Sequence, residues 1–271
     1  MTAAFTLDLE DHTGAYAPRG RHIDVARRIL DWCDAQDIRG TVFVVGRLAA
    51  SAPELVRELA ARGHEVACHS WSHEPLGQLG PEGFRADTLR AKALLEDVAQ
   101  HRVVGYRAPI FSLTRATPWA PDVLREAGFE YSSSVMPAPN PLHGFPEAPA
   151  HPFRWPSGLV ELPCPVRRIG PLTVPYLGGV YLRYLPLRLV ERWASRADGT
   201  VLWTYCHPYD FDADEPYTRI AGASTPTSVL LWLNRRGTWG RVGALAAGSR
   251  VTMAEVASRM QDLTTWSPSI S

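Results

Sequence analysis

Short apolar runs alternate along the chain with longer stretches whose apolar residues recur at helical spacing. Leu55, Val56 and Leu59, for example, share one helical face. Pro53 fits the first turn of that helix and Gly63 fits its C-cap. Strands are expected at 4–9, 41–45, 65–68, 103–106, 131–133, 159–162, 201–205 and 249–251. Helices are expected at 22–35, 52–62, 81–98, 117–127, 186–196 and 228–235. This alternation predicts βα units around a parallel sheet.

The 271 residues suffice for one large α/β domain with a substantial core. We expect a single domain over residues 1–262. Within it, the stretch 137–185 is rich in proline and glycine and predicts a long excursion over a barrel rim, with short strands embedded in it. Residues 263–271 are polar and predict a loose tail.

Charge and composition narrow the class of protein. Lysine and arginine (28) balance aspartate and glutamate (28), so the net charge gives no reason to expect nucleic acid or an acidic membrane surface as a partner. No apolar stretch approaches the roughly 20 residues that a transmembrane helix needs. The chain begins without the pattern of a signal peptide, so we expect a cytoplasmic protein. The oligomeric state stays open.

The cysteines are scattered, and their spacing does not suggest a disulfide framework. Reduced, buried thiols are therefore expected at Cys33, Cys68, Cys164 and Cys206.

Polar residues of types that can catalyse a reaction or bind a metal follow several of the expected strands. In parallel α/β folds, the carboxyl ends of strands meet at one edge, and functional residues collect there. We therefore expect these side chains to converge on one rim. They are Asp8 and Glu10, His69 and His73, Arg107, Ser132 to Ser134, and His207.

His69 and His73 are separated by three residues, which is the spacing of two side chains on one helical turn. Such imidazoles lie roughly 5–6 Å apart at Cβ and can bind one ion together. The acidic cluster at residues 8–11 could add a carboxylate. Three protein ligands and an open position are typical of a hydrolytic zinc site. The alternative is that this spacing arose by chance and that the histidines are packed core residues.

With these residues assembled, the sequence resembles the polysaccharide deacetylase family, the NodB-type carbohydrate esterases of family four, over roughly residues 3 to 260. The resemblance implies a distorted (β/α)7-type parallel barrel. Four motifs appear in family order: Thr6-Leu7-Asp8-Leu9-Glu10-Asp11, His69-Ser70-Trp71-Ser72-His73, Arg107-Ala108-Pro109-Ile110 and His207-Pro208. The segments 105–112, 178–183 and 207–212 look most like the subgroup associated with exopolysaccharide gene clusters.

The family pattern implies a role for each matched residue. Glu10, His69 and His73 would hold one divalent ion, expected to be zinc, although the same ligands accept other metals. Asp8 would be the catalytic base, with Arg107 paired to it. The backbone N–H of Ile110 would bind the oxyanion, and His207 would protonate the leaving amine.

The sequence departs from the family pattern at three places. Leu9 occupies the position of the usual second aspartate, so the carboxylate ligand must be Glu10 or Asp11. We favour Glu10, because a period of two puts it on the same strand face as Asp8. Ile110 replaces a tyrosine, and Ser132 stands where many relatives carry aspartate.

Some residues in the rim loops could recognise a sugar. Aromatic faces suit this task, although most tryptophans simply pack in cores. The aromatic candidates are Trp71, Trp155, Tyr181 and Tyr209. By resemblance, Arg183 would meet an anionic group such as a phosphate, and a surface salt bridge is the alternative.

The leading hypothesis is metal-dependent removal of an N-acetyl group from an N-acetylhexosamine unit of a saccharide or glycan precursor. A second reading keeps the site but changes the substrate to a formylated amino sugar or a cyclic imide. A third reading is a catalytically silent sugar-binding protein with the same fold.

Overall fold

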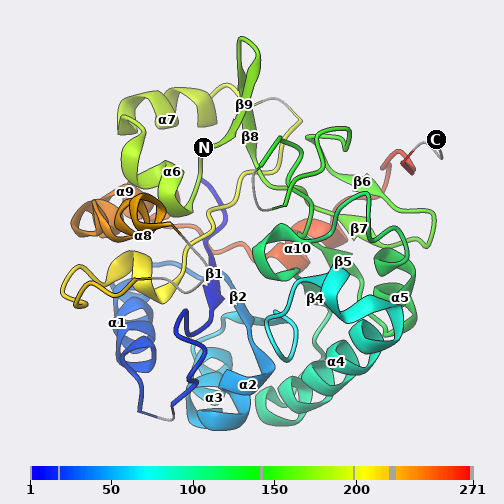
Figure 1. Cartoon of the computed structure of the whole chain (residues 1–271), viewed down its shortest axis with the longest axis horizontal. Coiled ribbons are helices and arrows are strands. Elements are labelled where there is room, and N and C mark those ends of the chain that lie inside the picture. Colours follow the sequence, from blue (N-terminus) through cyan, green and yellow to red (C-terminus); the bar gives the residue numbers. More distant parts are fainter. Residues whose placement is uncertain (1, 18, 141–142, 198, 220–223, 269–271) are drawn as a thin grey trace.

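The computed structural model describes residues 2–17, 19–140, 143–197, 199–219 and 224–268 (Figure 1). Within these ranges, one sheet has the strand order β1-β2-β3-β4-β5-β7-β6. All neighbours pair in parallel except β6 and β7, which are antiparallel. The strands are β1 (Thr6–Leu9), β2 (Thr41–Val44), β3 (Glu65–Cys68), β4 (Gly105–Tyr106), β5 (Tyr131–Ser132), β6 (Phe153–Arg154) and β7 (Val160–Glu161). A separate hairpin contains β8 (Val166–Ile169) and β9 (Leu172–Pro175).

Helices surround this sheet and its loops. Figure 1 shows α1 to α5 along one side of the molecule and α6 to α9 gathered on the other, below the projecting β8–β9 hairpin. The α-helices are α1 (Arg21–Ala35), α2 (Gly46–Ser51), α3 (Pro53–Ala61), α4 (Leu76–Ala99), α5 (Ala120–Glu126), α6 (Gly179–Tyr184), α7 (Leu187–Ala194), α8 (Thr225–Trp232), α9 (Thr238–Ala246) and α10 (Met253–Ser258). The 3-10 turns are η1 (Pro109–Phe111), η2 (Pro208–Phe211) and η3 (Arg235–Gly237).

The first strands are buried on both faces, which explains their continuous apolar runs. In β2, Val42, Phe43 and Val44 are all inaccessible to solvent. Helix α1 covers the sheet with an apolar face that includes Ile23 and Ile29. The α/β fold with a mostly parallel sheet is therefore confirmed.

Three expected elements differ from the structure. Residues 249–251 form no strand. In place of the strand expected at 201–205 there are isolated bridges at 203–206: Trp203 bridges to Ala4, Cys206 to Leu7 and Tyr205 to Gly178. The helix expected at 81–98 begins earlier, at Leu76, and is broken at Gly80 (φ 64°, ψ 175°). Pro81 restarts it, because proline fits the first turn of a helix. None of the described helices is long and apolar enough to span a membrane.

Residues 263–268 are not the loose tail that the polarity of this segment predicts. Thr265 bridges to Arg154, and the Trp266 N–H donates to the Arg154 carbonyl at 2.9 Å. The Trp266 ring makes edge contacts with Phe145, Phe153 and Trp155. Trp266, an aromatic residue in a mostly polar segment, was the signal that this segment packs against the protein. Residues 269–271 lie outside the described part of the chain.

Replacing Trp266 with alanine should lower the free energy of unfolding by about 2–4 kcal/mol, because the aromatic cluster loses one of its members. Urea unfolding measures this change. Leu89→Ala is the control, since Leu89 is exposed on α4 and should change stability by less than about 0.5 kcal/mol. Equal stability of the Trp266 variant and the wild type would contradict the docked tail.

Candidate metal and catalytic site

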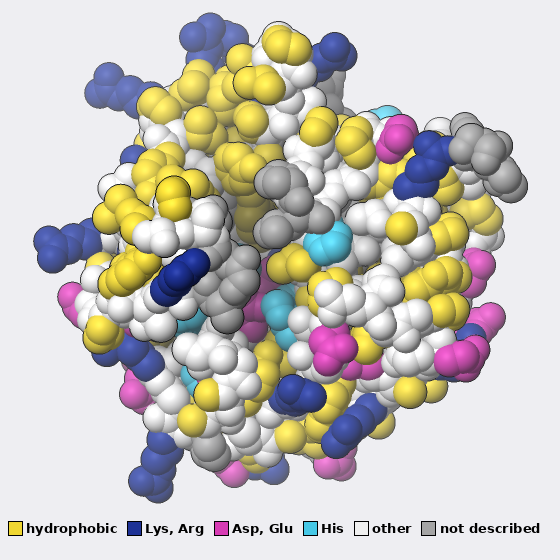
Figure 2. Space-filling model, viewed as in Figure 1, with side chains coloured by type: hydrophobic (Ala, Val, Ile, Leu, Met, Phe, Trp, Pro, Cys, Tyr) yellow, Lys and Arg dark blue, Asp and Glu magenta, His cyan; other side chains and the backbone are white. Residues whose placement is uncertain are grey.

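A cavity of about 190 Å³ opens at the carboxyl end of the parallel strands. Figure 2 shows a hollow in this face of the molecule, with acidic and histidine side chains visible inside it. Most of the candidate site residues singled out from the sequence line this cavity. They are Asp8, Glu10, His69, His73, Ile110, Tyr181, Arg183, His207 and Tyr209. The convergence expected from strand order is therefore present.

Glu10, His69 and His73 bring three potential ligand atoms within 4.8 Å of one another. The Nε2 atom of His69 lies 4.0 Å from Oε2 of Glu10, and His73 forms an ion pair with the same oxygen. The two imidazole centroids are 5.1 Å apart. This arrangement matches the ligand set chosen from the sequence.

The two histidines do not lie on a helical turn, so that expectation was wrong. Residues 69–75 form a loop in which Ser70 and His73 have positive φ values of 62° and 60°. The Asp87 carboxylate accepts the backbone N–H groups of Trp71 (2.7 Å) and Ser72 (3.0 Å). The Ser70 hydroxyl accepts the N–H of His73 at 2.8 Å. Hydrogen bonds to Asp87 and Ser70 therefore hold this loop so that the two imidazoles lie together. The sequence did not predict the role of Asp87.

The local chemistry fits a bound cation. Nδ1 of His69 lies 2.8 Å from the Arg107 carbonyl, so this nitrogen donates and Nε2 is left with a lone pair toward the cavity. Burial lowers the pKa of His69 to about 4, which keeps the ring in its neutral, ligating form. Oε2 of Glu10 is buried and accepts no hydrogen bond from a described residue. Burial alone would raise the pKa of Glu10, but His73 lowers it well below its usual value.

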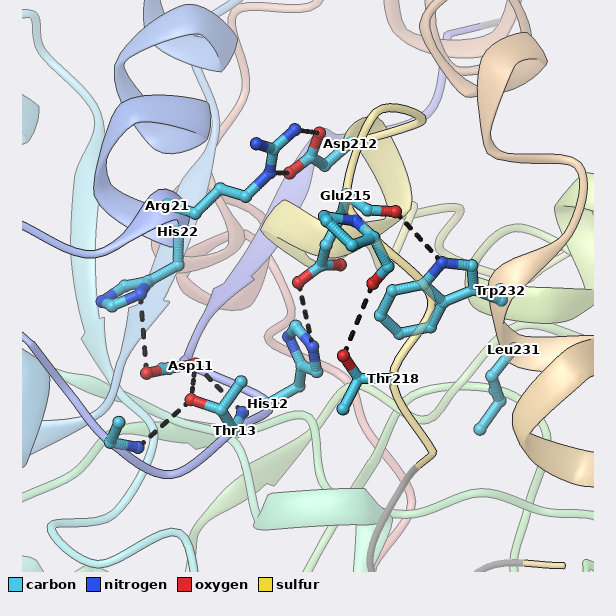
Figure 3. Close-up of polar contacts among 12 residues, drawn as sticks. Asp11, His12, Thr13, Arg21, His22, Asp212, Glu215, Thr218, Leu231 and Trp232 are labelled. Atoms are coloured by element: carbon cyan, nitrogen blue, oxygen red, sulfur yellow. Dashed lines mark hydrogen bonds and ion pairs between the residues drawn. The ribbon is translucent and has the colours of Figure 1, made fainter. Parts of the chain in front are cut away.

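The choice between Glu10 and Asp11 is explained by the loop that follows β1. Asp11 accepts hydrogen bonds from the backbone of Thr13 (3.0 Å) and Tyr16 (2.9 Å). It also lies 3.6 Å from Nδ1 of His22, as Figure 3 shows. Its carboxylate is thus used to shape the loop and does not line the cavity, whereas Glu10 lines it together with His69 and His73.

The same loop is fastened to the segment that follows His207. His12 lies 3.2 Å from Glu215, and Arg21 forms an ion pair with Asp212 (Figure 3). These contacts link the segment that carries Glu10 with the segment that carries His207. The two walls of the cavity are therefore held against each other by charged pairs outside it.

Asp8 is held by Arg107 at the base of the cavity. Nη1 of Arg107 lies 2.5 Å from Oδ1 of Asp8, and Nε donates to the Ser133 hydroxyl at 3.0 Å. The guanidinium is fully buried between the rings of Phe43 (3.9 Å) and Trp203 (4.3 Å). Arg107 is therefore an interior ion-pair partner and not a surface salt bridge.

Ile110 lies on the cavity rim in a strained conformation. Its φ of 49° and ψ of 29° are left-handed, which is unusual for a β-branched residue. Its N–H donates to no acceptor in the described part of the chain. The preceding Ala108 N–H is held by the Ser134 hydroxyl at 2.9 Å, which in turn accepts from Ser132 at 2.8 Å. The serine run thus positions this turn, and that is the polar role of Ser132.

His207 faces Asp8 across the cavity, with Nε2 at 3.8 Å from Oδ2 of Asp8. Asp210 accepts from both the backbone N–H (3.0 Å) and Nδ1 (2.9 Å) of His207. Burial alone would lower the pKa of His207, but Asp210, Glu10 and Asp8 raise it to about 9. Tyr209 stacks on the imidazole at 4.6 Å. Asp210 was missed, although its position three residues after His207 was a local signal.

The expected sugar-binding residues divide into two groups. Tyr181 and Tyr209 line the cavity, whereas Trp71 and Trp155 do not. Trp71 packs against Gly46 beneath the Arg90 guanidinium (3.6 Å), and Trp155 is buried in the core. A tryptophan in a motif loop can point into the cavity or pack against the protein, and Trp71 packs against the protein.

Arg183 reaches the cavity, but its charge is already engaged. Its Nη1 donates to the carbonyls of Leu231 (3.0 Å) and Leu233 (2.9 Å), and its Nε lies 3.4 Å from Asp210. The guanidinium is almost fully buried. Arg183 therefore supports Asp210 and the end of α8 from the interior, and it is not the surface salt bridge that was the alternative.

Comparison with known proteins gives two family matches. Residues 17–132 match the polysaccharide deacetylase model, and residues 133–258 match a domain of unknown function, DUF3473. A chitooligosaccharide deacetylase of Bradyrhizobium sp. (strain ANU 289) is 28% identical over 96 residues, which are 35% of this chain and 42% of the relative. A peptidoglycan-N-acetylglucosamine deacetylase of Bacillus cereus is 27% identical over 92 residues, 34% of this chain and 31% of the relative. The matched segment thus spans less than half of either relative.

Solved structures share the fold over most of the chain. A candidate polysaccharide deacetylase of Mycobacterium smegmatis has a TM-score of 0.64 at 24% identity, covering 99% of this chain and 93% of its own. The allantoinase PuuE has a TM-score of 0.56 at 14% identity, with coverage of 94% and 88%. A family-four pseudoenzyme of Bacillus anthracis has a TM-score of 0.52 at 11% identity, with coverage of 94% and 65%. At these identities the likeness concerns the fold alone.

The assignment of Glu10 and not Asp11 as a ligand predicts how zinc binding should change. Glu10→Gln should weaken zinc affinity by more than about a hundredfold, because it removes a direct anionic ligand. Asp11→Asn, the matched control, should retain most of the affinity. Isothermal titration calorimetry of the metal-free protein with zinc measures both. Loss of affinity in Asp11→Asn alone would reverse the assignment.

Proposed function

Because the chain belongs to the polysaccharide deacetylase family, we propose that it is a metal-dependent hydrolase that removes the N-acetyl group from an N-acetylhexosamine unit of a saccharide or glycan precursor. The observation that supports this most is the meeting of three kinds of group in one cavity. These are a ligand trio (Glu10, His69 and His73), a carboxylate held by a buried arginine (Asp8), and a histidine with a raised pKa (His207).

Amide hydrolysis needs an activated water, a stabilised oxyanion and a protonated leaving amine. A divalent ion, which we propose to be zinc, would supply Lewis-acid polarisation and would lower the pKa of a water. Asp8 accepts the proton of the attacking water. Arg107 fixes the direction of this carboxylate through its hydrogen bond.

The remaining steps fall to groups on the facing walls. The N–H of Ile110 has no described acceptor and is available to the oxygen on which negative charge develops. His207 is protonated at neutral pH because its pKa is raised to about 9, so it can donate a proton to the departing amine. Tyr181 and Tyr209 offer faces on which a sugar ring can rest.

The names of the relatives support the proposed substrate class. Those relatives are described as acting on chitooligosaccharide and on peptidoglycan N-acetylglucosamine. An N-acetylhexosamine unit is common to both. The same catalytic groups could also open a cyclic imide or remove a formyl group, which is the second candidate, and an allantoinase shares the fold.

A silent sugar-binding protein is disfavoured by the way the site is built. Sugar binding alone has no need for a buried carboxylate with a dedicated arginine, or for a histidine that an aspartate holds in a fixed position. Several buried hydrogen bonds hold these groups in place. Such fixed positions are expected where the groups take part in a reaction.

An acetate-release assay on acetylated chitooligosaccharides, with and without a chelator, tests the proposal. Acetate should appear, stop with the chelator and return with added zinc. His69→Ala should lower the rate by at least about a hundredfold, because a ligand is lost. His101→Ala, which changes an exposed histidine elsewhere, is the control. Formate or a ring-opened product from the corresponding substrates would favour the second candidate, and zinc-independent sugar binding without turnover would favour the silent protein.

The contact between Asp210 and His207 predicts a change in pH dependence. Asp210 raises the pKa of His207, so Asp210→Asn should lower it and move the alkaline limb of the kcat profile to lower pH. Asp212→Asn is the matched control, because Asp212 pairs with Arg21 and not with His207. An unchanged alkaline limb in Asp210→Asn would argue against His207 as the acid.

A further inference from the structure

Large apolar side chains are exposed together on one side of the cavity. Ile169 and Leu172 (64% exposed) form the tip of the β8–β9 hairpin. Four more, which we name the apolar ledge, lie on α6 and at α8: Tyr184, Val229, Leu230 and Leu233. Figure 2 shows hydrophobic side chains gathered over this region, beside the hollow. Exposed apolar groups that cluster in this way mark a binding surface.

The elements of this surface are joined to one another. The Tyr184 hydroxyl donates to the Leu230 carbonyl at 2.9 Å, which fixes α6 against α8. Tyr176, just after β9, packs edge-on against Trp193 of α7 at 5.7 Å. The hairpin tip and the ledge are therefore parts of one connected unit and not isolated loops.

The same elements carry exposed arginines. Arg168 lies on β8, Arg188 and Arg192 lie on α7, and Arg236 lies on η3. Arg188, Arg192 and Arg236 form no ion pair with any residue that the structure describes. Within β8, β9, α6 to α9 and η3, Glu191 is the one acidic residue. Because the whole chain has zero net charge, this surface is markedly more cationic than the rest.

We propose that this surface binds the face of an anionic lipid bilayer. The hairpin tip and the ledge enter the headgroup region, and the arginines contact lipid phosphates. Charge complementarity selects this partner. A second copy of the chain would bring one cationic surface against another across a twofold axis, and like charges there repel. A nucleic acid would leave Leu172 and the ledge without an apolar environment.

Docking in this way places the cavity at the bilayer surface. Leu231 lines the cavity, and its neighbour Leu230 belongs to the ledge. A saccharide presented at the membrane would then meet Tyr181 and Arg183 at the cavity wall. Bilayer binding does not depend on the proposed hydrolysis, so the two can fail separately.

Vesicle flotation tests the proposal without a substrate. The full chain should float with vesicles of phosphatidylcholine and phosphatidylglycerol at low ionic strength. It should bind much less to pure phosphatidylcholine, and added salt should weaken binding, because phosphate contacts by arginine are screened.

Two independent variants locate the contact, so a folding defect in one does not decide the result. Leu172→Asp and the double variant Arg188→Glu/Arg192→Glu should each weaken vesicle binding by roughly tenfold or more. The controls change matched residues on other faces: Leu89→Asp on α4 (44% exposed) and Arg57→Glu on α3. Both controls should bind as the wild type does. Acetate release from a soluble oligosaccharide should be unchanged in Leu172→Asp.

Three results would overturn the proposal. The first is no flotation with anionic vesicles at low salt. The second is binding that both test variants retain, or that both controls lose to the same degree. The third is a stable dimer in solution that Leu172→Asp dissociates, which would make this surface an interface between two copies. Light scattering during gel filtration measures the third.

Discussion

The buried ion pair between Arg107 and Asp8 is the interaction on which the rest of the site depends. A guanidinium removed from water is costly unless its charge is neutralised and its N–H groups are bonded. Here Nη1 and Nε donate to Asp8, Thr6 and Ser133, whereas Nη2 has no hydrogen-bond partner among the described residues. The rings of Phe43 and Trp203 cover its faces. The carboxylate of Asp8 must stay beside Arg107 to neutralise this buried charge, and the same carboxylate is the proposed base. The folded core therefore fixes the position of the base.

This constraint extends to the oxyanion turn through the backbone. The Arg107 carbonyl accepts from His69, so the residue that holds Asp8 also orients a proposed metal ligand. The following Ala108 N–H is held by Ser134, whose own N–H donates to the buried carboxylate of Glu161 at 2.7 Å. Burial raises the pKa of Glu161. The strained conformation of Ile110 is thus maintained by polar contacts of Ser132, Ser134 and Glu161, none of which lines the cavity.

The sequence was sufficient to predict features that depend on local pattern and strand order. It was not sufficient where contacts between residues far apart in the chain determine a loop or a side-chain direction. The placement of Asp8 and Glu10 followed from strand alternation, and the meeting of His69 with them followed from parallel topology. The geometry of the histidine loop could not be predicted, because Asp87 shapes it from the middle of α4. The directions of Trp71 and Trp266 were likewise decided by packing partners far away in sequence.

The relation between the proposed base and acid is fixed by backbone register. The Asp8 N–H donates to the Cys206 carbonyl at 2.8 Å, and Leu7 bridges to Cys206. Asp8 and His207 are therefore carried by neighbouring extended segments, and their side chains meet across 3.8 Å. A slip of one residue would turn one of them to the opposite face. The segment 203–206 forms only isolated bridges, yet these are sufficient, because Arg107 stacks on Trp203 and ties the segment to the same buried charge. The ion pair between Arg107 and Asp8 thus also maintains the register that places His207 opposite Asp8.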